Sequence, residues 1–325
     1  MEKTDNAAGG GEIYDLAIIG GGPAGLSAGL YGARARLKTL LIERGLFGGQ
    51  AATTDHIANY PGFPEGVGGA ELAERMSQQA QAFGLETVFG EVTGVKNDGG
   101  LKMIDLSGTN YTARTLIIAT GSEPSQLGVP GEAEFRGKGV SYCATCDGAF
   151  FRNKDIVVVG GGDAAVEEGI YLTRFARQVT IVHRRDKFRA TQVVQEHAFA
   201  NPKIKLIWNA VVEEIKGGQV VEAVKLRDTV KGTTQEIPAS GVFIYVGTKP
   251  NTAFLGDLLQ LDDRGYIPAD ERMHTSAPGI FAAGDVRRKD LRQVVTAVSD
   301  GAIAAVEAEK YVEAQREAGV TSGRK

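Results

Sequence analysis

The two cysteines of the chain lie close together in the segment CATC, Cys143 to Cys146. Two thiols at this spacing can form a disulfide that opens and closes during a reaction, can supply half of a metal site, or can pack as small apolar side chains. The chain has 325 residues, of which 42% are hydrophobic, so it can form a core without a structural disulfide. A redox pair is therefore the first interpretation to test.

A metal centre is the weaker alternative, because structural zinc generally requires four Cys or His ligands. The chain has no second cysteine pair. Its four histidines, His56, His183, His197 and His274, are scattered along the sequence. We therefore expect no metal ion.

The residue after the second cysteine, Asp147, is a candidate proton carrier. A thiolate, rather than a thiol, attacks a disulfide, and a free thiol with a pKa of about 8.5 is mostly protonated at neutral pH. A C-x-x-C pair at the start of a helix has a lowered thiol pKa, because the amide dipoles stabilise the thiolate. We predict that Asp147 exchanges a proton with the dithiol. The alternative is that Asp147 only shapes the turn CDG.

The cysteine pair lies between two similar stretches that have to position it. The first contains a strand-like run (YDLAIIG), a glycine turn (GGGPAG), a helical segment and a second strand (KTLLIER). The second repeats this order with DIVVVG, GGGDAA, VEEGIYLTRFA and QVTIVHRR, so that Gly160 matches Gly20. Strand, helix and strand at these lengths form a βαβ unit. We predict an α/β protein with two Rossmann-like dinucleotide-binding domains, the second inserted into the first.

Two similar segments, TLIIATGS and GVFIYVGTKPN, indicate where the chain leaves the first domain and returns to it. The predicted first domain comprises residues 1–122 and 250–325. The predicted second domain, residues 123–249, carries the cysteine pair.

The first glycine turn has the pattern G-x-G-x-x-G, formed by Gly20, Gly22 and Gly25. These glycines allow a tight turn, a close approach of the backbone to a pyrophosphate, and close packing of helix on strand. The helix that follows directs its positive N-terminal end at the phosphates. Glu43 ends the second strand, where a carboxylate can accept hydrogen bonds from both ribose hydroxyls.

The second glycine turn has the pattern G-x-G-x-x-A, formed by Gly160, Gly162 and Ala165. The position that matches Glu43 is His183, and Arg184, Arg185 and Arg189 follow it. A carboxylate would repel a 2′-phosphate, whereas guanidinium groups bind phosphate through paired hydrogen bonds. The second site is therefore expected to prefer NADP(H) over NAD(H).

Composition excludes several other classes of protein. The net charge is −4 and no broad block of Lys and Arg is present, so nucleic acid is not an expected partner. No apolar run approaches the roughly 20 residues of a membrane-spanning helix, so no membrane is expected. The polar first segment MEKTDNAAGGGE has no apolar core, so we expect no signal peptide and a cytoplasmic protein.

With these motifs in order, the chain resembles the low-molecular-weight, bacterial-type thioredoxin reductases, flavoproteins with two nucleotide domains. The resemblance extends along nearly the whole chain. It rests on GGGPAG with Glu43, GGQAATTDHIANYPG, ATGS, CATCDGAFF, GGGDAAVEE, HRRDKFRA, GIFAAGDV and RQVVTA. CATCD between the two glycine turns is the most specific of these.

The resemblance implies FAD in the first domain and NADPH in the second. Near FAD it places Gly20, Gly22, Pro23, Ala24, Gly25, Glu43, Gln50, Thr54, Asn59, Gly121, Asp285, Arg292, Gln293 and Val294. Near NADPH it places Gly160, Gly162, Asp163, Ala164, Ala165, His183, Arg184, Arg185 and Arg189. Relatives often have serine where this chain has Ala164, so one hydrogen bond to a phosphate is expected to be missing.

The resemblance also implies a reaction. NADPH reduces FAD, FAD reduces the Cys143–Cys146 disulfide with Cys146 nearest the flavin, and the dithiol reduces thioredoxin. The disulfide and the nicotinamide cannot occupy one flavin face together, so a rotation of the inserted domain about the two crossings is implied, as is a homodimer. Phe150 and Phe151 follow the redox motif and Arg136 and Lys138 precede it, so these residues are candidates for docking thioredoxin; the alternative is two core phenylalanines and two solvated charges. The alternatives left open are a ferredoxin- or flavodoxin-linked reductase, a flavin-dependent reductase of another protein or small-molecule disulfide, and a non-enzymatic redox- or nucleotide-sensing module.

Overall fold

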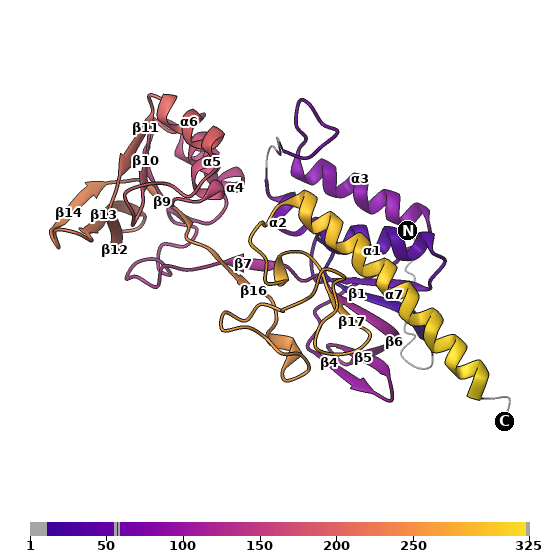
Figure 1. Ribbon diagram of the computed structural model, residues 1–325. Helices are drawn as coiled ribbons and strands as arrows, with labels where there is room; N and C mark the ends of the chain where they lie inside the picture. Colours follow the sequence, from indigo (N-terminus) through magenta and orange to yellow (C-terminus); the bar gives the residue numbers. More distant parts are fainter. Residues whose placement is uncertain (1–11, 55–56, 58, 323–325) are drawn as a thin grey trace. The chain divides into compact units, whose positions relative to one another are not determined.

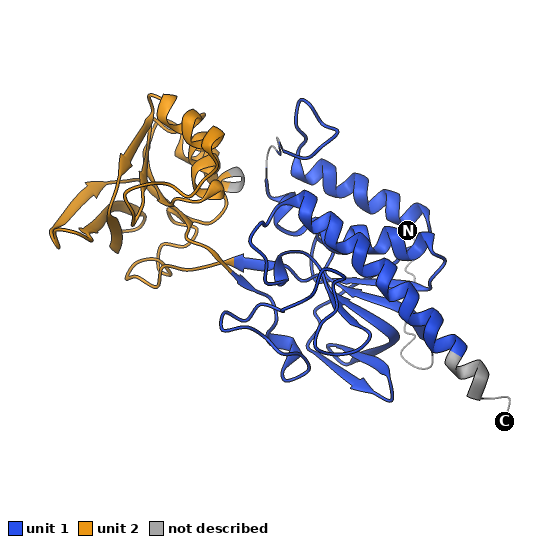
Figure 2. Cartoon of the chain, in the orientation of Figure 1, with its two compact units in different colours: residues 1–123, 249–325 blue, residues 124–248 orange. Residues whose placement is uncertain are grey.

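The structure is a computed structural model that describes residues 12–54, 57 and 59–322, without the side chains of residues 145–146 and 318–322. The chain divides into two compact units (Figure 2). Unit 1 comprises residues 1–123 and 249–325, and unit 2 comprises residues 124–248. None of the described helices is both long and apolar enough to cross a membrane.

Unit 1 is built on a seven-stranded sheet with the order β3-β2-β1-β6-β5-β4, in which β17 also pairs with β6. The pairs β1–β2, β1–β6, β2–β3 and β6–β17 are parallel, and β4–β5 and β5–β6 are antiparallel. The strands are β1 Ile13–Ile19, β2 Thr39–Glu43, β3 Glu86–Phe89, β4 Gly94–Asp98, β5 Leu101–Leu106, β6 Thr109–Ile118 and β17 Ile280–Ala282. The helices are α1 Pro23–Arg34, α2 Gly49–Ala52, α3 Gly69–Ala82 and α7 Val294–Ser322, with short 3-10 turns η2 Ala253–Leu255 and η3 Gly284–Val286.

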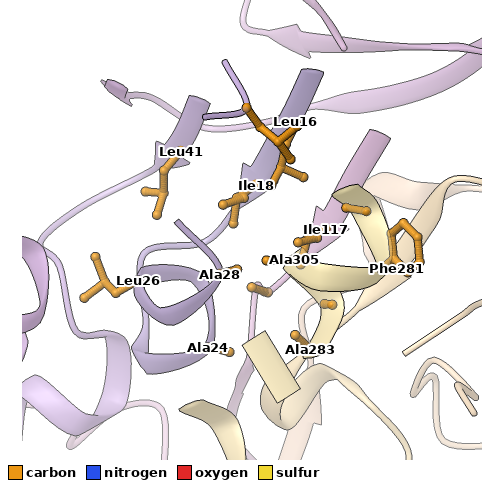
Figure 3. Close-up of a cluster of buried hydrophobic side chains, with 14 of the residues drawn as sticks. Leu16, Ile18, Ala24, Leu26, Ala28, Leu41, Ile117, Phe281, Ala283 and Ala305 are labelled. Carbon is orange, nitrogen blue, oxygen red and sulfur yellow. The ribbon is translucent and has the colours of Figure 1, made fainter. Parts of the chain in front are cut away.

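One of the buried clusters of unit 1 lies between this sheet and helices α1 and α7, which run beside each other (Figures 1 and 3). The central strands are apolar on both faces, as expected for parallel strands that are covered on both sides. Small side chains let the two helices approach each other. A Cβ on Gly301 of α7 would lie 2.0 Å from the carbonyl oxygen of Ala24 in α1. The buried residues drawn in Figure 3 include Leu16, Ile18, Ala24, Leu26, Ala28, Leu41, Ile117, Phe281, Ala283 and Ala305.

Unit 2 contains a five-stranded parallel sheet with the order β11-β10-β9-β15-β8 and an antiparallel three-stranded sheet, β12-β13-β14. The strands are β8 Val140–Ser141, β9 Asp155–Gly160, β10 Gln178–Val182, β11 Ile204–Ile207, β12 Ala210–Gly217, β13 Val221–Asp228, β14 Thr234–Pro238 and β15 Gly241–Tyr245. The helical segments are α4 Ala144–Asp147, the 3-10 turn η1 Gly148–Phe151, α5 Asp163–Leu172 and α6 Gln192–Ala200.

The chain crosses between the units on two short strands, β7 Ser122–Pro124 and β16 Thr248–Pro250, which pair with each other. At the end of this ribbon in unit 1, the Asn251 amide donates to the Gly121 carbonyl over 3.0 Å, and Thr120 Oγ1 donates to the Asn251 carbonyl over 2.7 Å. At the end in unit 2, the Ser125 amide donates to the Gly247 carbonyl over 2.8 Å. Hydrogen bonds therefore close the ribbon at both ends.

Candidate functional site

The three glycines of the first turn lie between β1 and α1 in different environments. Gly20 has a φ of +107°, a left-handed conformation that favours glycine. A Cβ on Gly25 would lie 1.8 Å from the carbonyl oxygen of Gly20, so this glycine lets the helix pack against the turn. A Cβ on Gly22 would meet no atom within 4 Å. The fold does not require glycine at Gly22, and the open space beside it fits the pyrophosphate of a dinucleotide.

Glu43 is attached to the first turn by its own carboxylate. Oε2 accepts the Gly21 amide over 2.6 Å and Oε1 accepts the Gly45 amide over 2.8 Å. The next loop is tied back by the Gly48 amide, which donates to the Gly21 carbonyl over 2.8 Å. Two lone-pair positions of a carboxylate remain after two such bonds, so Glu43 can still accept from ribose hydroxyls. Pro23 begins α1, where its fixed φ suits the first helical position, and Ala24 is buried behind it.

Asp285 lies in η3, which packs against the start of α1. A Cβ on Gly284 would lie 2.9 Å from Ala24 Cβ, so the two turns are adjacent. Asp285 Oδ1 is buried and has no hydrogen-bond partner among the described residues. Burial raises the pKa of the Asp285 carboxyl, and the charges of Lys289 and Arg292 oppose this rise. A buried acceptor without a partner at this place fits a hydroxyl-bearing ligand.

The other residues expected near the flavin come from four separate segments of unit 1. Asn59 Nδ2 donates to Gln293 Oε1 over 3.0 Å, although the two residues are 234 positions apart. Gln50 Nε2 donates to the carbonyl of Ser122, next to Gly121, and Thr54 follows α2. Val294 packs on the small apolar cluster of Ile57, Val67 and Leu72.

Arg292 is held over an aromatic ring. Its guanidinium carbon lies 4.5 Å from the centroid of the Tyr266 ring, a cation–π distance. Its Nε is buried without a hydrogen-bond partner among the described residues. Arg292 therefore resembles Asp285 in presenting an unpaired buried polar atom, here a donor.

The second turn, between β9 and α5, repeats the geometry of the first. Gly160 has a φ of +150°, and a Cβ there would lie 2.6 Å from Ala165 Cβ. Gly162 has a φ of −93°, and the atom nearest to a Cβ there would be Nη2 of Arg189, at 4.0 Å. The neighbouring Ala164 is exposed. This turn therefore also leaves open space beside its second glycine, with a guanidinium at its edge.

The cations after β10 do not all lie in the same environment. Arg184, Arg185 and Arg189 are exposed. His183 is 4% exposed, and its ring lies directly beneath the turn, where a Cβ on Gly161 would be 2.3 Å from its Nδ1. Burial, followed by the charges of the three arginines, lowers the pKa of His183, so the ring is neutral. We expected His183 to contact a cofactor phosphate, but its ring is buried and packs against Gly161 of the turn.

Cys143 is disulfide-bonded, and the one other cysteine of the chain is Cys146, whose side chain lies outside the described residues. The backbone of Cys143 is fixed on both sides. Its amide donates to Ser141 Oγ over 3.1 Å, and its carbonyl accepts the amide of Asp147 over 3.2 Å. Asp147 ends the short helix α4, so the expected proton carrier lies one helical turn from Cys143.

Tyr245 also holds the redox segment, and the sequence motifs did not indicate it. Its hydroxyl accepts the Ala144 amide over 2.9 Å. Burial, and then the charge of Glu168, raises the pKa of the Tyr245 phenol far above its usual value, so the group stays protonated. On the other side of Cys143, the Tyr142 hydroxyl donates to Glu132 Oε1 over 2.6 Å, and Glu132 is 4% exposed.

The two phenylalanines after the cysteine pair point in different directions. Phe150 is 74% exposed, whereas Phe151 is 7% exposed. Phe151 meets Phe243 edge to face at 5.2 Å, and a Cβ on Gly241 would lie 2.3 Å from its ring. The expected pair is therefore one surface residue and one core residue. Arg136 and Lys138 are exposed, and Arg136 lies 5.5 Å from the Tyr142 ring centroid.

Comparison with known proteins gives consistent matches over almost the whole chain. The family model "Pyridine nucleotide-disulphide oxidoreductase" matches residues 14–301. The thioredoxin reductase of Peptoclostridium acidaminophilum is 52% identical over 311 residues, which cover 94% of this chain and 99% of the relative. The thioredoxin reductase of Bacillus subtilis (strain 168) is 51% identical over 308 residues, which cover 94% and 97%.

Solved structures agree with these sequences. The thioredoxin reductase of Lactococcus lactis is 49% identical, with a TM-score of 0.90 and coverage of 92% of this chain and 99% of that chain. The thioredoxin reductase of T. acidophilum is 37% identical, with a TM-score of 0.88 and coverage of 92% and 99%. The expected α/β fold with two Rossmann-like domains is confirmed, and so is the resemblance inferred from the motifs.

Proposed function

The chain belongs to the pyridine nucleotide-disulphide oxidoreductase family, and from that premise we propose that it is an NADPH-dependent thioredoxin-disulfide reductase that uses FAD. One observation carries the proposal. A disulfide-bonded cysteine in CATCD lies between two glycine turns, and both turns leave open space beside their second glycine. The two curated relatives described above are both thioredoxin reductases, which supports the same substrate.

We assign FAD to the domain formed by residues 1–122 and 250–325. The open space beside Gly22 would receive its pyrophosphate, and Glu43 would accept from the adenosine ribose. The unpaired Oδ1 of Asp285 and Nε of Arg292 would find partners on the bound cofactor. The Asn59–Gln293 pair would lie near the isoalloxazine ring. Bound flavin would supply the transfer of an electron pair between a nicotinamide and a disulfide.

We assign NADPH to the domain formed by residues 123–249. The backbone of Gly162 and Ala164 would face the pyrophosphate. Arg184, Arg185 and Arg189 are exposed at the end of the second strand, where the adenosine 2′-phosphate would be bound by guanidinium groups. The three charges favour a phosphate that NADH lacks.

Within the redox segment, the chain's own residues hold the disulfide and move protons. Ser141 and Tyr245 hold the backbone of Cys143 and Ala144. Asp147 would donate a proton as the dithiol forms and accept one as the dithiol reacts. The reaction is balanced as NADPH, one proton and a thioredoxin disulfide giving NADP⁺ and a thioredoxin dithiol.

Phe150, Arg136 and Lys138 are all exposed, and we place thioredoxin against Phe150 with the two cations contributing to its binding. The protein would act as a homodimer in the cytoplasm, where disulfides are kept reduced. The paired strands β7 and β16 would allow the inserted domain to rotate, because a few residues at the ends of elements can absorb such a motion.

The test is NADPH oxidation by the purified yellow protein with and without oxidised thioredoxin. We expect turnover only when thioredoxin is present, and loss of turnover on Cys146→Ser. Turnover by that variant would refute the mechanism. Replacing Arg184 and Arg185 by Ala should raise the KM for NADPH far more than that for NADH, whereas Lys231→Ala, in the hairpin loop between β13 and β14, should leave both unchanged. Oxidised small-molecule disulfides tested in the same assay separate this function from a general disulfide reductase.

A further inference from the structure

The loop that carries the exposed arginines is attached to the second glycine turn by two hydrogen bonds. The Arg189 amide donates to the Gly161 carbonyl over 2.7 Å, and the Thr191 amide donates to Asp163 Oδ1 over 2.8 Å. The two donors are separated by one residue, so one short stretch of loop is held at two adjacent points. At the same place, Arg189 Nη2 lies 4.0 Å from the position that a Gly162 Cβ would occupy.

The first turn makes the corresponding backbone bond, from the Gly48 amide to the Gly21 carbonyl, but a different side-chain bond. There the acid is Glu43, at the end of the second strand, and it accepts the Gly21 amide. In unit 2 the matching strand end is the buried His183, and the acid that ties turn to loop stands at the first position of α5 instead. An acidic side chain therefore makes a hydrogen bond to a backbone amide at both turns, but the acid stands at the end of the second strand in unit 1 and at the start of the helix in unit 2.

A carboxylate at this position needs an explanation, because it stands at the start of α5, the helix end at which cofactor phosphates would bind. At the first turn of a helix an acid is favourable for the helix dipole, but it repels a nearby phosphate. The bond to the Thr191 amide gives this carboxylate a role that does not involve the cofactor. It engages a backbone donor two residues beyond Arg189.

We propose that Asp163 is a positioning residue for the preference for NADPH over NADH. Its carboxylate holds the loop of residues 184–191 against the turn, and so keeps the Arg189 guanidinium within reach of a 2′-phosphate. Without this bond the arginine remains present, but its loop is held to the turn only by the bond from the Arg189 amide to the Gly161 carbonyl. The nucleotide then loses the interaction that depends on the 2′-phosphate, and keeps the interactions that NADH shares. This inference rests on the proposed NADPH site of unit 2.

The experiment measures two ligands that differ only in the relevant phosphate. Titration calorimetry of the flavin-loaded protein gives the Kd values of 2′,5′-ADP and 5′-AMP, and steady-state kinetics gives kcat/KM for NADPH and NADH. Asp163→Ala should weaken 2′,5′-ADP roughly tenfold, the scale of one charge-assisted hydrogen bond, and change 5′-AMP by less than about twofold. Asp163→Asn keeps a neutral, weaker oxygen acceptor for the Thr191 amide and should give a ratio between those of the wild type and Asp163→Ala.

A matched control removes a carboxylate of the same loop that makes no such bond. Asp186 is exposed and has no hydrogen bond or ion pair with any described residue. Asp186→Ala takes away the same charge near the same arginines, and should not lower the ratio of the two affinities. The control separates loss of the hydrogen bond from loss of negative charge.

The donor can also be removed from the other side. Thr191 has a φ of −62°, which suits proline, and its side chain makes no capping bond. Thr191→Pro should therefore cost the same fraction of 2′,5′-ADP affinity as Asp163→Ala, and the double variant should be no worse than either single one. If Asp163→Ala does not fold, Thr191→Pro alone tests the bond.

Two failures are distinguishable. If the wild-type protein binds 2′,5′-ADP no better than 5′-AMP, the proposed NADPH site is wrong. If the wild type discriminates but Asp163→Ala and Thr191→Pro discriminate equally well, the NADPH site stands and the positioning role of Asp163 is refuted.

Discussion

Asp285 provides a test in which binding and stability should change in opposite directions. Its carboxyl has a raised pKa because it is buried, and its Oδ1 has no partner among the described residues. Asp285→Asn keeps the shape and an acceptor oxygen but removes the charge. The variant should bind FAD more weakly and, when free of flavin, should be more stable than the wild type at neutral pH.

The magnitudes follow from the cost of an unpaired buried group. Such a group costs about 1–3 kcal/mol, and one unit of pKa shift corresponds to about 1.4 kcal/mol. We expect flavin-free Asp285→Asn to gain about 1 kcal/mol, or roughly 2–4 °C in Tm. The FAD Kd should rise about tenfold, because a neutral amide oxygen is a weaker acceptor for a ribityl hydroxyl than a carboxylate.

The pH dependence has a defined sign. A carboxyl whose pKa is raised in the folded protein holds its proton more tightly there than in the unfolded chain. Stability therefore falls as the pH rises from the unfolded pKa, near 3.8, through the raised folded pKa, and the full penalty is present above it. Asp285→Asn should abolish this component of the decrease.

The assay is calorimetric unfolding of flavin-free protein over a pH series, together with fluorescence titration of FAD. Asp290→Asn, an exposed acid in the same segment, is the control and should change neither quantity. The reasoning fails if flavin-free Asp285→Asn is less stable than the wild type at neutral pH, or if its FAD Kd is unchanged.

Three further changes test other parts of the structure. Gly22→Ala should leave the Tm of the flavin-free protein nearly unchanged, because its Cβ would enter open space, and should greatly weaken FAD binding, because that space is where the pyrophosphate would lie. Gly25→Ala should prevent stable folding of unit 1, because its Cβ would lie 1.8 Å from the Gly20 carbonyl oxygen. Equal Tm values for the two variants would contradict this. Phe150→Ala should raise the KM for thioredoxin about tenfold, the effect of removing an anchor residue from an interface, and should leave reduction of a small disulfide unchanged. Parallel loss of both activities would count against a docking role. Burial lowers the pKa of the fully buried Lys102, so the free energy of unfolding should rise with pH in the alkaline range below the unfolded pKa of 10.5. Lys102→Met should remove that rise. Lys96→Met, at an exposed lysine, is the control and should keep it.

The two glycine turns were predictable because their chemistry is local. Strand, turn and helix lie within one continuous stretch, so the spacing of Gly20, Gly22 and Gly25 carries the geometry. The acid that ends β2 follows from the same stretch. The overall α/β class was predictable for the same reason, since each βαβ unit is contiguous and its pattern occurs twice.

Contacts between distant segments were not predictable in the same way. The Asn59–Gln293 bond joins residues 234 positions apart, and the Ala144–Tyr245 bond joins residues 101 positions apart. Each depends on how segments remote in the sequence are brought together by the fold, which no local spacing encodes. Sequence motifs therefore indicated Asn59 and Gln293 separately, and did not indicate Tyr245.

The direction of a side chain was the other information that the motifs lacked. His183 has the same place in the repeat as Glu43, yet it is buried with Phe188 and Trp208 around it. Phe151 turns inward because Gly241 leaves room for its ring, while Phe150 beside it faces solvent. Both outcomes depend on packing partners that are remote in the sequence.

The ribbon of β7 and β16 has a consequence for how such a protein can be rebuilt. Because the two strands pair, the first and last residues of the inserted segment lie next to each other. A cassette with adjacent ends can be cut out of a gene and replaced without moving the remainder of the host domain. Residues 124–248 are thus a natural unit of genetic exchange, and a foreign nucleotide-binding domain whose termini are equally close could be spliced between Glu123 and Lys249.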